Sequence, residues 1–198
     1  MPGLCQFRCR LSLVGAFVHE VSALLQHEEY LSTNHGNLLA SILVRYPQIG
    51  TLQVLPHSRC MRFGFFVKGP SDSEPFLEFS KCLSDSIEAL VFLAGKQLAV
   101  LDMQVSRYED FSLLELARDM SSLSLQEISL IVSLLEEHFG EGLVCSAEDT
   151  EEDLTWYDDF IQHVLEDINN DTPLQELIGF REGGRILVFN KSHASSNS

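Results

Sequence analysis

The stretch TLQVLPHSRCMRFGFFVK, residues 51–68, decides the fold of this chain. Apolar side chains alternate with other residues on both sides of a turn at residues 56–58. The alternating positions are Leu52, Val54, Met61, Phe63, Phe65 and Val67. A period of two residues places such side chains on one face of a strand, so residues 51–68 are predicted to form a β-hairpin with one buried face.

The chain before the hairpin predicts a strand followed by helix. Apolar and polar residues alternate over residues 5–13, which is the pattern of a half-buried strand. Apolar residues then follow helical spacing over residues 16–30 and again over residues 34–43. Pro47 ends the second helical segment, because proline cannot continue a helix.

A helix and a strand follow the hairpin. Ser71 and Glu74 have the spacing of a capping box, which marks the first turn of a helix, and Gly95 can end that helix. Residues 98–106 alternate again and predict a strand. The order over residues 4–106 is therefore strand, helix, strand, strand, helix, strand, which is the βαββαβ order of a ferredoxin-like sandwich.

The second half of the chain begins with an ambiguous segment. Residues 110–118 (DFSLLELAR) favour a helix by residue type, but Phe111, Leu113 and Ala117 also suit a strand, so both remain open. Ser124 and Glu127 form a second capping box, and Gly140 can end the helix that they begin. A helix is therefore predicted between Ser124 and Gly140.

An acidic segment is predicted to form an amphipathic helix over residues 150–168. Its apolar positions at helical spacing are Leu154, Tyr157, Phe160, Ile161, Val164, Leu165 and Ile168. Such a stripe needs a buried partner, which distinguishes the segment from a disordered acidic tail. A short helix over residues 172–184 and a strand over residues 185–190 are predicted to follow.

Together these elements predict an α+β protein with a ferredoxin-like (βαββαβ) sandwich, added C-terminal helices and a final strand. The ferredoxin-like core is expected in residues 1–106. Residues 107–191 are expected to form a helical elaboration whose acidic helix packs on the core. Residues 192–198 are expected to be a disordered tail, because they are polar and terminal.

Charge is distributed unevenly along the 198 residues, whose formal net charge is −16. Residues 1–70 carry six basic and three acidic side chains, whereas residues 121–198 carry three basic and sixteen acidic ones. No Lys or Arg occurs between Asp119 and Phe180. Acid concentrated in this way repels phosphate backbones, so nucleic-acid binding by the whole chain is disfavoured.

Composition excludes several classes of protein. A hydrophobic fraction of 45% is too high for a chain disordered throughout. The longest apolar runs fall short of the ~20 residues that cross a bilayer, and the N-terminus lacks the pattern of a signal peptide. The five cysteines are odd in number, which favours free thiols over a disulfide framework. We therefore expect a cytoplasmic protein that does not enter a membrane.

Two alternative functions rest on weaker patterns. His138 and His163, with carboxylates near them, could bind a divalent metal, but no spacing completes a ligand set, so no metal or cofactor is predicted. An RNA-binding module could lie in the basic N-terminal third, with Phe63 and Phe65 stacking on bases. Both aromatic residues also fit the buried face of the predicted hairpin.

The favoured hypothesis is a non-catalytic interaction or regulatory protein. The sequence has no phosphate loop, dinucleotide fingerprint or nucleophile elbow. The acidic helix would present its charged side to a basic surface of a partner protein. The expected partner-binding residues are Glu151, Glu152, Asp153, Asp158 and Asp159.

Overall fold

The predicted hairpin is present as β1 (Thr51–Leu55) and β2 (Cys60–Lys68) in the computed structural model, which describes residues 34–69, 73–145, 154–168, 174–182 and 184–190. The two strands are antiparallel, and Leu52 pairs with Phe63. The paired residues share one face of the sheet, as their alternation predicts.

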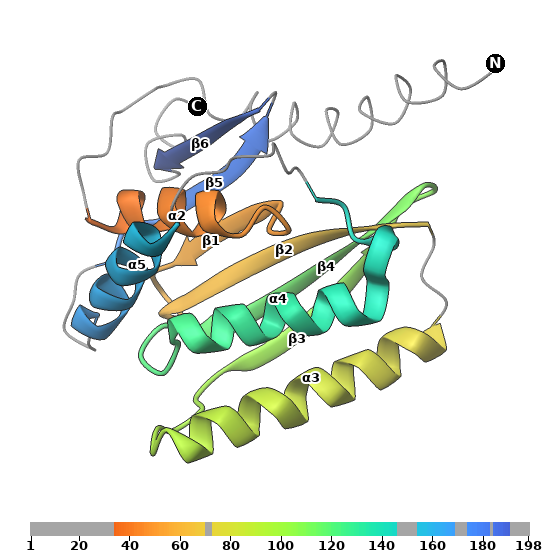
Figure 1. Cartoon of the computed structure of the whole chain (residues 1–198), viewed down its shortest axis with the longest axis horizontal. Coiled ribbons are helices and arrows are strands. Elements are labelled where there is room, and N and C mark those ends of the chain that lie inside the picture. The colour runs from red at the N-terminus through yellow and green to blue at the C-terminus, as the bar shows by residue number, and fades with distance from the viewer. Residues whose placement is uncertain (1–33, 70–72, 146–153, 169–173, 183, 191–198) are drawn as a thin grey trace.

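Four more strands extend the hairpin into a six-stranded antiparallel sheet (Figure 1). They are β3 (Leu101–Arg107), β4 (Phe111–Asp119), β5 (Leu177–Glu182) and β6 (Arg185–Asn190). The strand order is β3-β4-β2-β1-β5-β6. An α+β fold and the final strand are thus confirmed.

The ferredoxin-like strand order is not found. In that arrangement the strand of residues 60–68 would lie beside the predicted strand of residues 5–13, which is outside the described residues. Here β2 instead pairs with β4 in a register that joins Phe63 to Leu116. Every position of β4 except Glu115 is buried, since β4 has a neighbouring strand on each side, the main core on one face and the Phe66, Phe111 and Leu113 cluster on the other.

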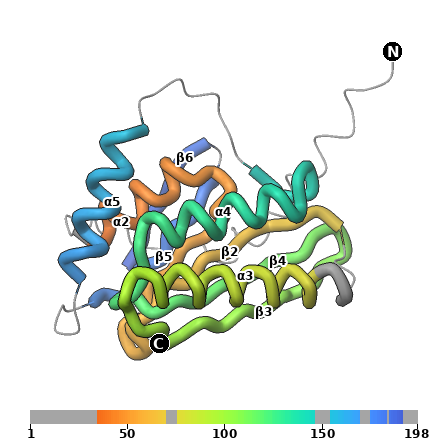
Figure 2. Tube along the Cα trace, turned by 60° about the horizontal axis from the view of Figure 1, so that its bottom comes forward, coloured from red at the N-terminus to blue at the C-terminus, as the bar shows by residue number. Residues whose placement is uncertain are grey.

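The helices are α2 (Asn34–Arg45), α3 (Ser73–Leu93), α4 (Leu125–Phe139) and α5 (Thr155–Asp167). A single 3₁₀ turn, η1 (Gly140–Gly142), follows α4. All four helices lie on the same side of the sheet (Figures 1 and 2). No helix within these described segments is long and apolar enough to span a bilayer.

The predicted ends of α4 are confirmed by its capping contacts. The hydroxyl of Ser124 accepts a hydrogen bond from the backbone N–H of Glu127 at 3.2 Å. Gly140 has a φ of 47°, a left-handed conformation that glycine adopts without strain. The Ser124 hydroxyl therefore caps the start of α4, and the glycine ends it, whereas the Glu127 carboxylate binds Arg118.

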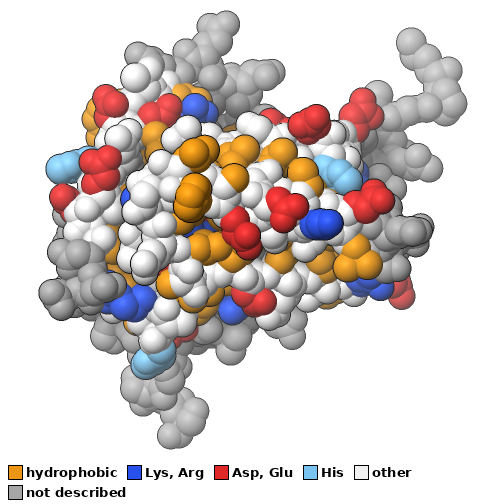
Figure 3. All heavy atoms as spheres, turned by 90° about the horizontal axis from the view of Figure 1, so that it is seen from below, with side chains coloured by type: hydrophobic (Ala, Val, Ile, Leu, Met, Phe, Trp, Pro, Cys, Tyr) orange, Lys and Arg blue, Asp and Glu red, His pale blue; other side chains and the backbone are white. Residues whose placement is uncertain are grey.

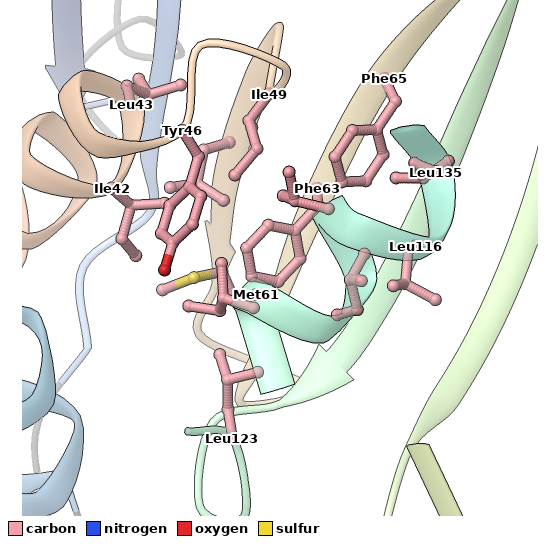
Figure 4. Close-up of a cluster of buried hydrophobic side chains, with 14 of the residues drawn as sticks. Ile42, Leu43, Tyr46, Ile49, Met61, Phe63, Phe65, Leu116, Leu123 and Leu135 are labelled. Atoms are coloured by element: carbon pink, nitrogen blue, oxygen red, sulfur yellow. The ribbon is translucent and has the colours of Figure 1, made fainter. Parts of the chain in front are cut away.

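The main core lies between the sheet and the helices. Apolar residues of β2 and β4 meet residues of α2 and α4, as Figure 4 shows for Tyr46, Phe63, Leu116 and Leu135. Phe63 and Phe65 are completely buried, so both are core residues. The opposite side of the sheet carries a small separate cluster, which consists of Phe66, Phe111 and Leu113, with Val144 packed against it.

The structure decides one open prediction and corrects another. The open choice at residues 110–118 is settled as strand β4. The predicted short helix at residues 172–184 is wrong, because residues 177–182 form strand β5 between β1 and β6. Pairing with the free edge of β1 outweighs local helix preference here, as tertiary context often does.

The domain division at residue 106 stays a prediction. The sheet contains β1, β2 and β3 from one predicted part and β4, β5 and β6 from the other.

The acidic helix α5 places Ile161, Val164 and Leu165 in the main core. The expected tail at residues 192–198, like the expected helix at residues 16–30, lies outside the described residues.

Gly179 in β5 allows a close approach of α2 to the sheet. A Cβ added there would lie 2.9 Å from Cδ1 of Leu43. We predict that Gly179→Ala lowers the free energy of unfolding by about 1–3 kcal/mol, as overpacking of a core does. Gly142→Ala is the control, because its added Cβ would meet no atom closer than 4.0 Å. Urea denaturation of both variants tests this, and equal stabilities would contradict it.

Candidate functional site

One side of α5 is buried and the other is exposed. Residues at positions 156, 159, 163, 166 and 167 fall on the same side of the helix, because their spacings are close to whole turns. We call this side the α5 outer face. It consists of Trp156, Asp159, His163, Glu166 and Asp167, all of which are exposed. The opposite side meets the core through Ile161, Val164 and Leu165.

Trp156 is the most unusual member of the α5 outer face. It is 63% exposed, although tryptophan side chains are usually well covered. Its ring stacks on Phe160 with 5.5 Å between ring centroids and 11° between planes, and it meets Tyr157 edge to face at 5.1 Å. These contacts hold the indole in one orientation while its other face remains open to solvent.

The rest of the α5 outer face is acidic. The amide of Gln162 donates a hydrogen bond to Glu166 at 2.8 Å, and His163 lies 3.5 Å from a carboxylate oxygen of Asp167. Because no Lys or Arg occurs between Asp119 and Phe180, a protonated His163 would be the only cation on this helix. The face therefore combines one aromatic ring with a surplus of negative charge.

Contacts from the end of α2 hold α5 and α4 in place. The Arg45 guanidinium donates a hydrogen bond to the Asp158 carboxylate at 2.7 Å. The hydroxyls of Tyr46 and Ser129 lie 2.7 Å apart, which joins α2 to α4. Asp158 thus fixes α5 on the body of the protein, and this position aims the α5 outer face away from the core.

The predicted partner-binding residues fall into three groups. Glu151, Glu152 and Asp153 lie outside the described residues. Asp158 is engaged by Arg45 within the chain, whereas Asp159 is exposed on the α5 outer face. Sequence reasoning did not single out Trp156, although an indole on the polar side of an amphipathic helix is itself a signal of an interaction surface.

A second cluster of charged groups lies inside the protein. The Arg118 side chain is fully buried and donates two hydrogen bonds to the Glu127 carboxylate, at 2.5 and 3.0 Å. It also donates to the Asp119 carboxylate, to the Ser122 hydroxyl at 2.9 Å and to the carbonyl of Val100 at 2.6 Å. All five N–H donors of this guanidinium are therefore satisfied by the protein itself.

The two carboxylates of this cluster differ in pKa. Burial opposes ionisation of Asp119, but hydrogen bonds from Ser122 and from the backbone of Val100, together with Arg118, hold its pKa well below the ordinary value. Burial raises the pKa of Glu127, and the Arg118 guanidinium opposes this rise. Asp119 is thus the firmly ionised partner of Arg118.

A depression of about 340 Å³ lies close to the buried cluster. Its lining comes from the start of α4 and from α5, and includes Ser124, Ser129, Gln162 and Glu166. Lys96, which also lines it, donates a hydrogen bond to the carbonyl of Ser122 at 3.3 Å. The Arg118 guanidinium does not line this depression, so its bonds are structural ones inside the fold.

The structure does not bring together the predicted metal-ligand candidates. His138 lies in the last turn of α4 and contacts the rings of Phe79 and Phe139. His163 lies on α5, which meets the other end of α4, roughly 20 Å away at 1.5 Å per residue. Across the described residues, no group of three or more His, Cys, Asp or Glu side chains is arranged to hold a metal ion.

Comparison with known proteins adds no relative. No protein family, curated protein or solved structure matches the chain. The physical features of the α5 outer face therefore carry the functional argument.

Arg118 is predicted to be essential for stability. Arg118→Met leaves two carboxylates in the interior without their cation, and we expect it to lower the free energy of unfolding by about 3–5 kcal/mol. Arg118→Met combined with Glu127→Gln should recover part of this loss, because one uncompensated charge is removed. Urea denaturation measures both, and a single variant that costs less than about 1 kcal/mol would contradict the structural role.

The low pKa of Asp119 predicts a pH-dependent contribution to stability. Since the folded pKa lies below the unfolded value of about 3.9, the contribution is present above about pH 4 and is lost as pH falls towards the folded pKa. The wild type should exceed Asp119→Asn by about 2 kcal/mol at pH 7, and the difference should shrink towards pH 2.

Denaturant unfolding between pH 2.5 and 7 tests this expectation. Asp159→Asn is the matched control, because it removes one exposed carboxylate from the α5 outer face without touching the buried cluster. A difference between wild type and Asp119→Asn that stays constant over this pH range would refute the assignment.

Proposed function

We propose that this chain is a non-catalytic protein-binding module that presents the α5 outer face to a basic segment of a partner protein. The observation that carries the proposal is the 63% exposure of Trp156 at the end of an acidic helix face. Tryptophan is among the residues that most often dominate binding energy at protein interfaces.

The chemistry of the face supports a Lys- or Arg-rich partner. An open indole face attracts a cation by about 0.5–2 kcal/mol, and most strongly when water is excluded. Carboxylates at Asp159, Glu166 and Asp167 attract the same cations at longer range and raise the association rate. The aromatic ring and the acids therefore favour one kind of partner.

The size of the face limits the partner segment. The 13 residues of α5 span about 20 Å at 1.5 Å per residue. An extended segment of about six residues covers that length, since a strand rises about 3.3 Å per residue. A short basic segment is thus sufficient to contact Trp156 at one end and Asp167 at the other.

The interior supports a non-catalytic role. Among the described residues, the carboxylate whose pKa is shifted most strongly is Asp119, which is bonded to Arg118, Ser122 and the backbone of Ala99 and Val100. A general acid or base needs access to a substrate proton. These bonds occupy the carboxylate oxygens of Asp119, which supports a structural role for it.

A synthetic peptide of five Arg-Ser repeats provides a direct test. Trp156 is the only tryptophan in the chain, so its fluorescence reports on the α5 outer face. We expect saturable quenching or a spectral shift that weakens as NaCl rises from 0.1 to 1 M, because the Debye length falls from about 10 to about 3 Å. A peptide of five Gln-Ser repeats is the uncharged control.

Two variants distinguish the α5 outer face from the total charge of the protein. The acid-neutralised variant is Asp159→Asn, Glu166→Gln and Asp167→Asn. The control variant of equal charge, on exposed residues near β3 and β4, is Asp102→Asn, Glu109→Gln and Asp110→Asn. We expect about tenfold weaker binding for the first only. Equal weakening in both would mean that the peptide follows net charge, and the proposal would fail.

The contribution of the indole is tested separately with a fluorescently labelled peptide. Trp156→Ala should weaken binding about tenfold, which is within the range of interface hot spots. Tyr108→Ala removes another exposed aromatic ring and should leave the affinity unchanged. If Trp156→Ala bound the peptide as tightly as the wild type, Trp156 would not be a binding residue and the proposal would be contradicted.

A further inference from the structure

A second exposed surface lies on α3, the outermost helix beside the β3 edge of the sheet (Figures 1 and 2). Its inner side enters the main core through Phe76, Phe79, Leu83, Ile87 and Val91. Its outer side carries Leu77 and Phe92, which are 70% and 80% exposed. Large apolar side chains this exposed on a helix mark a surface that favours a partner.

Two exposed ionic side chains lie between these apolar residues. Lys81 and Glu88 are both exposed, and the steps from Leu77 to Lys81, Glu88 and Phe92 are four, seven and four residues. These steps keep all four side chains on one side of a helix. We call them the α3 outer face. Figure 3, seen from the side on which α3 lies, shows apolar and charged side chains intermixed on this surface.

The α3 outer face is complementary to a reversed copy of itself. Its centre falls between Ser84 and Asp85, with an apolar residue at each end and Lys81 and Glu88 between them. Asp85, which is also exposed, lies beside this centre, so two copies of its carboxylate come close together there and oppose association. When a second α3 runs antiparallel through the same centre, Leu77 meets Phe92 and Lys81 meets Glu88. Each contact then occurs twice, as the two-fold symmetry of an isologous interface requires.

We propose that the chain forms a homodimer in which two α3 helices pack antiparallel through their outer faces. The partner of the α3 outer face is a second copy of this chain, because Lys81 of one copy meets Glu88 of the other only when the two helices run antiparallel. This inference concerns a different helix from the α5 outer face. It stands or falls independently of the proposed basic partner.

The length of the contact sets the expected strength of the dimer. Leu77 and Phe92 are separated by about 22 Å along the helix. A single pair of helices buries less than the roughly 800 Å² per partner of a standard interface, so a dissociation constant in the micromolar range is expected. Two chains of net charge −16 also repel each other, so salt near 0.15 M, with a Debye length of about 8 Å, favours association.

Sedimentation velocity of the full chain over about 1–200 μM tests the dimer, since micromolar association lies within this range. We expect a reversible shift from a species of 22.3 kDa to one of twice that mass. Phe92→Glu should weaken the dimer tenfold or more, because a charge replaces an apolar contact that occurs twice. Its thermal unfolding should match the wild type, since residue 92 is 80% exposed.

Charge reversal distinguishes this interface from any other. Lys81→Glu and Glu88→Lys should each raise the dimer dissociation constant about tenfold, because each places like charges opposite one another at two symmetric positions. The double variant should return it to near the wild-type value. Lys81 and Glu88 are about 10.5 Å apart along one helix, which is too far for a direct pair within the chain. Such a rescue therefore reports contact between copies.

Glu109→Lys, an exposed charge reversal outside α3, is the control and should leave the dimer unchanged. A chain that stays monomeric over the whole concentration range overturns the proposal. A dimer that ignores both single reversals also overturns it, because the second copy must then dock elsewhere, for example on the edge strand β3. A double variant that dimerises no better than either single variant contradicts the antiparallel register.

Discussion

The arrangement of the elements depends on the interior ion cluster around Arg118. Its guanidinium joins the end of β4 to Glu127 in the first turn of α4. Asp119 also accepts hydrogen bonds from the backbone N–H groups of Ala99 and Val100, both at 3.1 Å, and so positions the chain that enters β3. A buried cation without its carboxylates would be far costlier than an apolar side chain, so these contacts must form together.

This cluster determines the geometry of the surface as well as the core. The first turn of α4 is fixed by Glu127, and α4 in turn contacts α2 through Ser129 and Tyr46. Arg45, next to Tyr46, binds Asp158 and holds α5. The position of the exposed indole therefore follows from a chain of buried and half-buried polar contacts that begins at Arg118.

The spacing of apolar residues predicted helices and strands well in segments that follow either the strand period or the helix period throughout. The β1–β2 hairpin and the limits of α4 follow from alternation and from Ser124 and Gly140, because these signals act within a few residues. The order of strands could not be predicted in the same way. Every neighbouring pair of strands is antiparallel. The alternation in β2 shows which face is buried, but it does not indicate whether the second neighbour of β2 is β4 or another strand.

The buried cluster was also missed, although a local signal was present. Arg118 alternates with Leu114 and Leu116 along β4, which places a cation on the buried face of that strand. An arginine in such a position demands acidic partners, and Asp119 and Glu127 are close in sequence. Because residues 110–118 suit both a helix and a strand, their pattern alone does not assign the faces of the segment. The pairing of Arg45 with Asp158 joins residues far apart in the chain and has no local signature.

The position of α2 has a consequence for the order in which the chain acquires its structure during synthesis. This helix emerges before every other described element, yet it packs mainly against α5, β5 and β6, which emerge last. Leu43 meets Gly179 only after more than 130 further residues have been added. At a synthesis rate of about 5–20 residues per second, the apolar side of α2 remains without these partners for roughly 7–30 s. The six-stranded sheet therefore cannot enclose α2 until β5 and β6 have been synthesised.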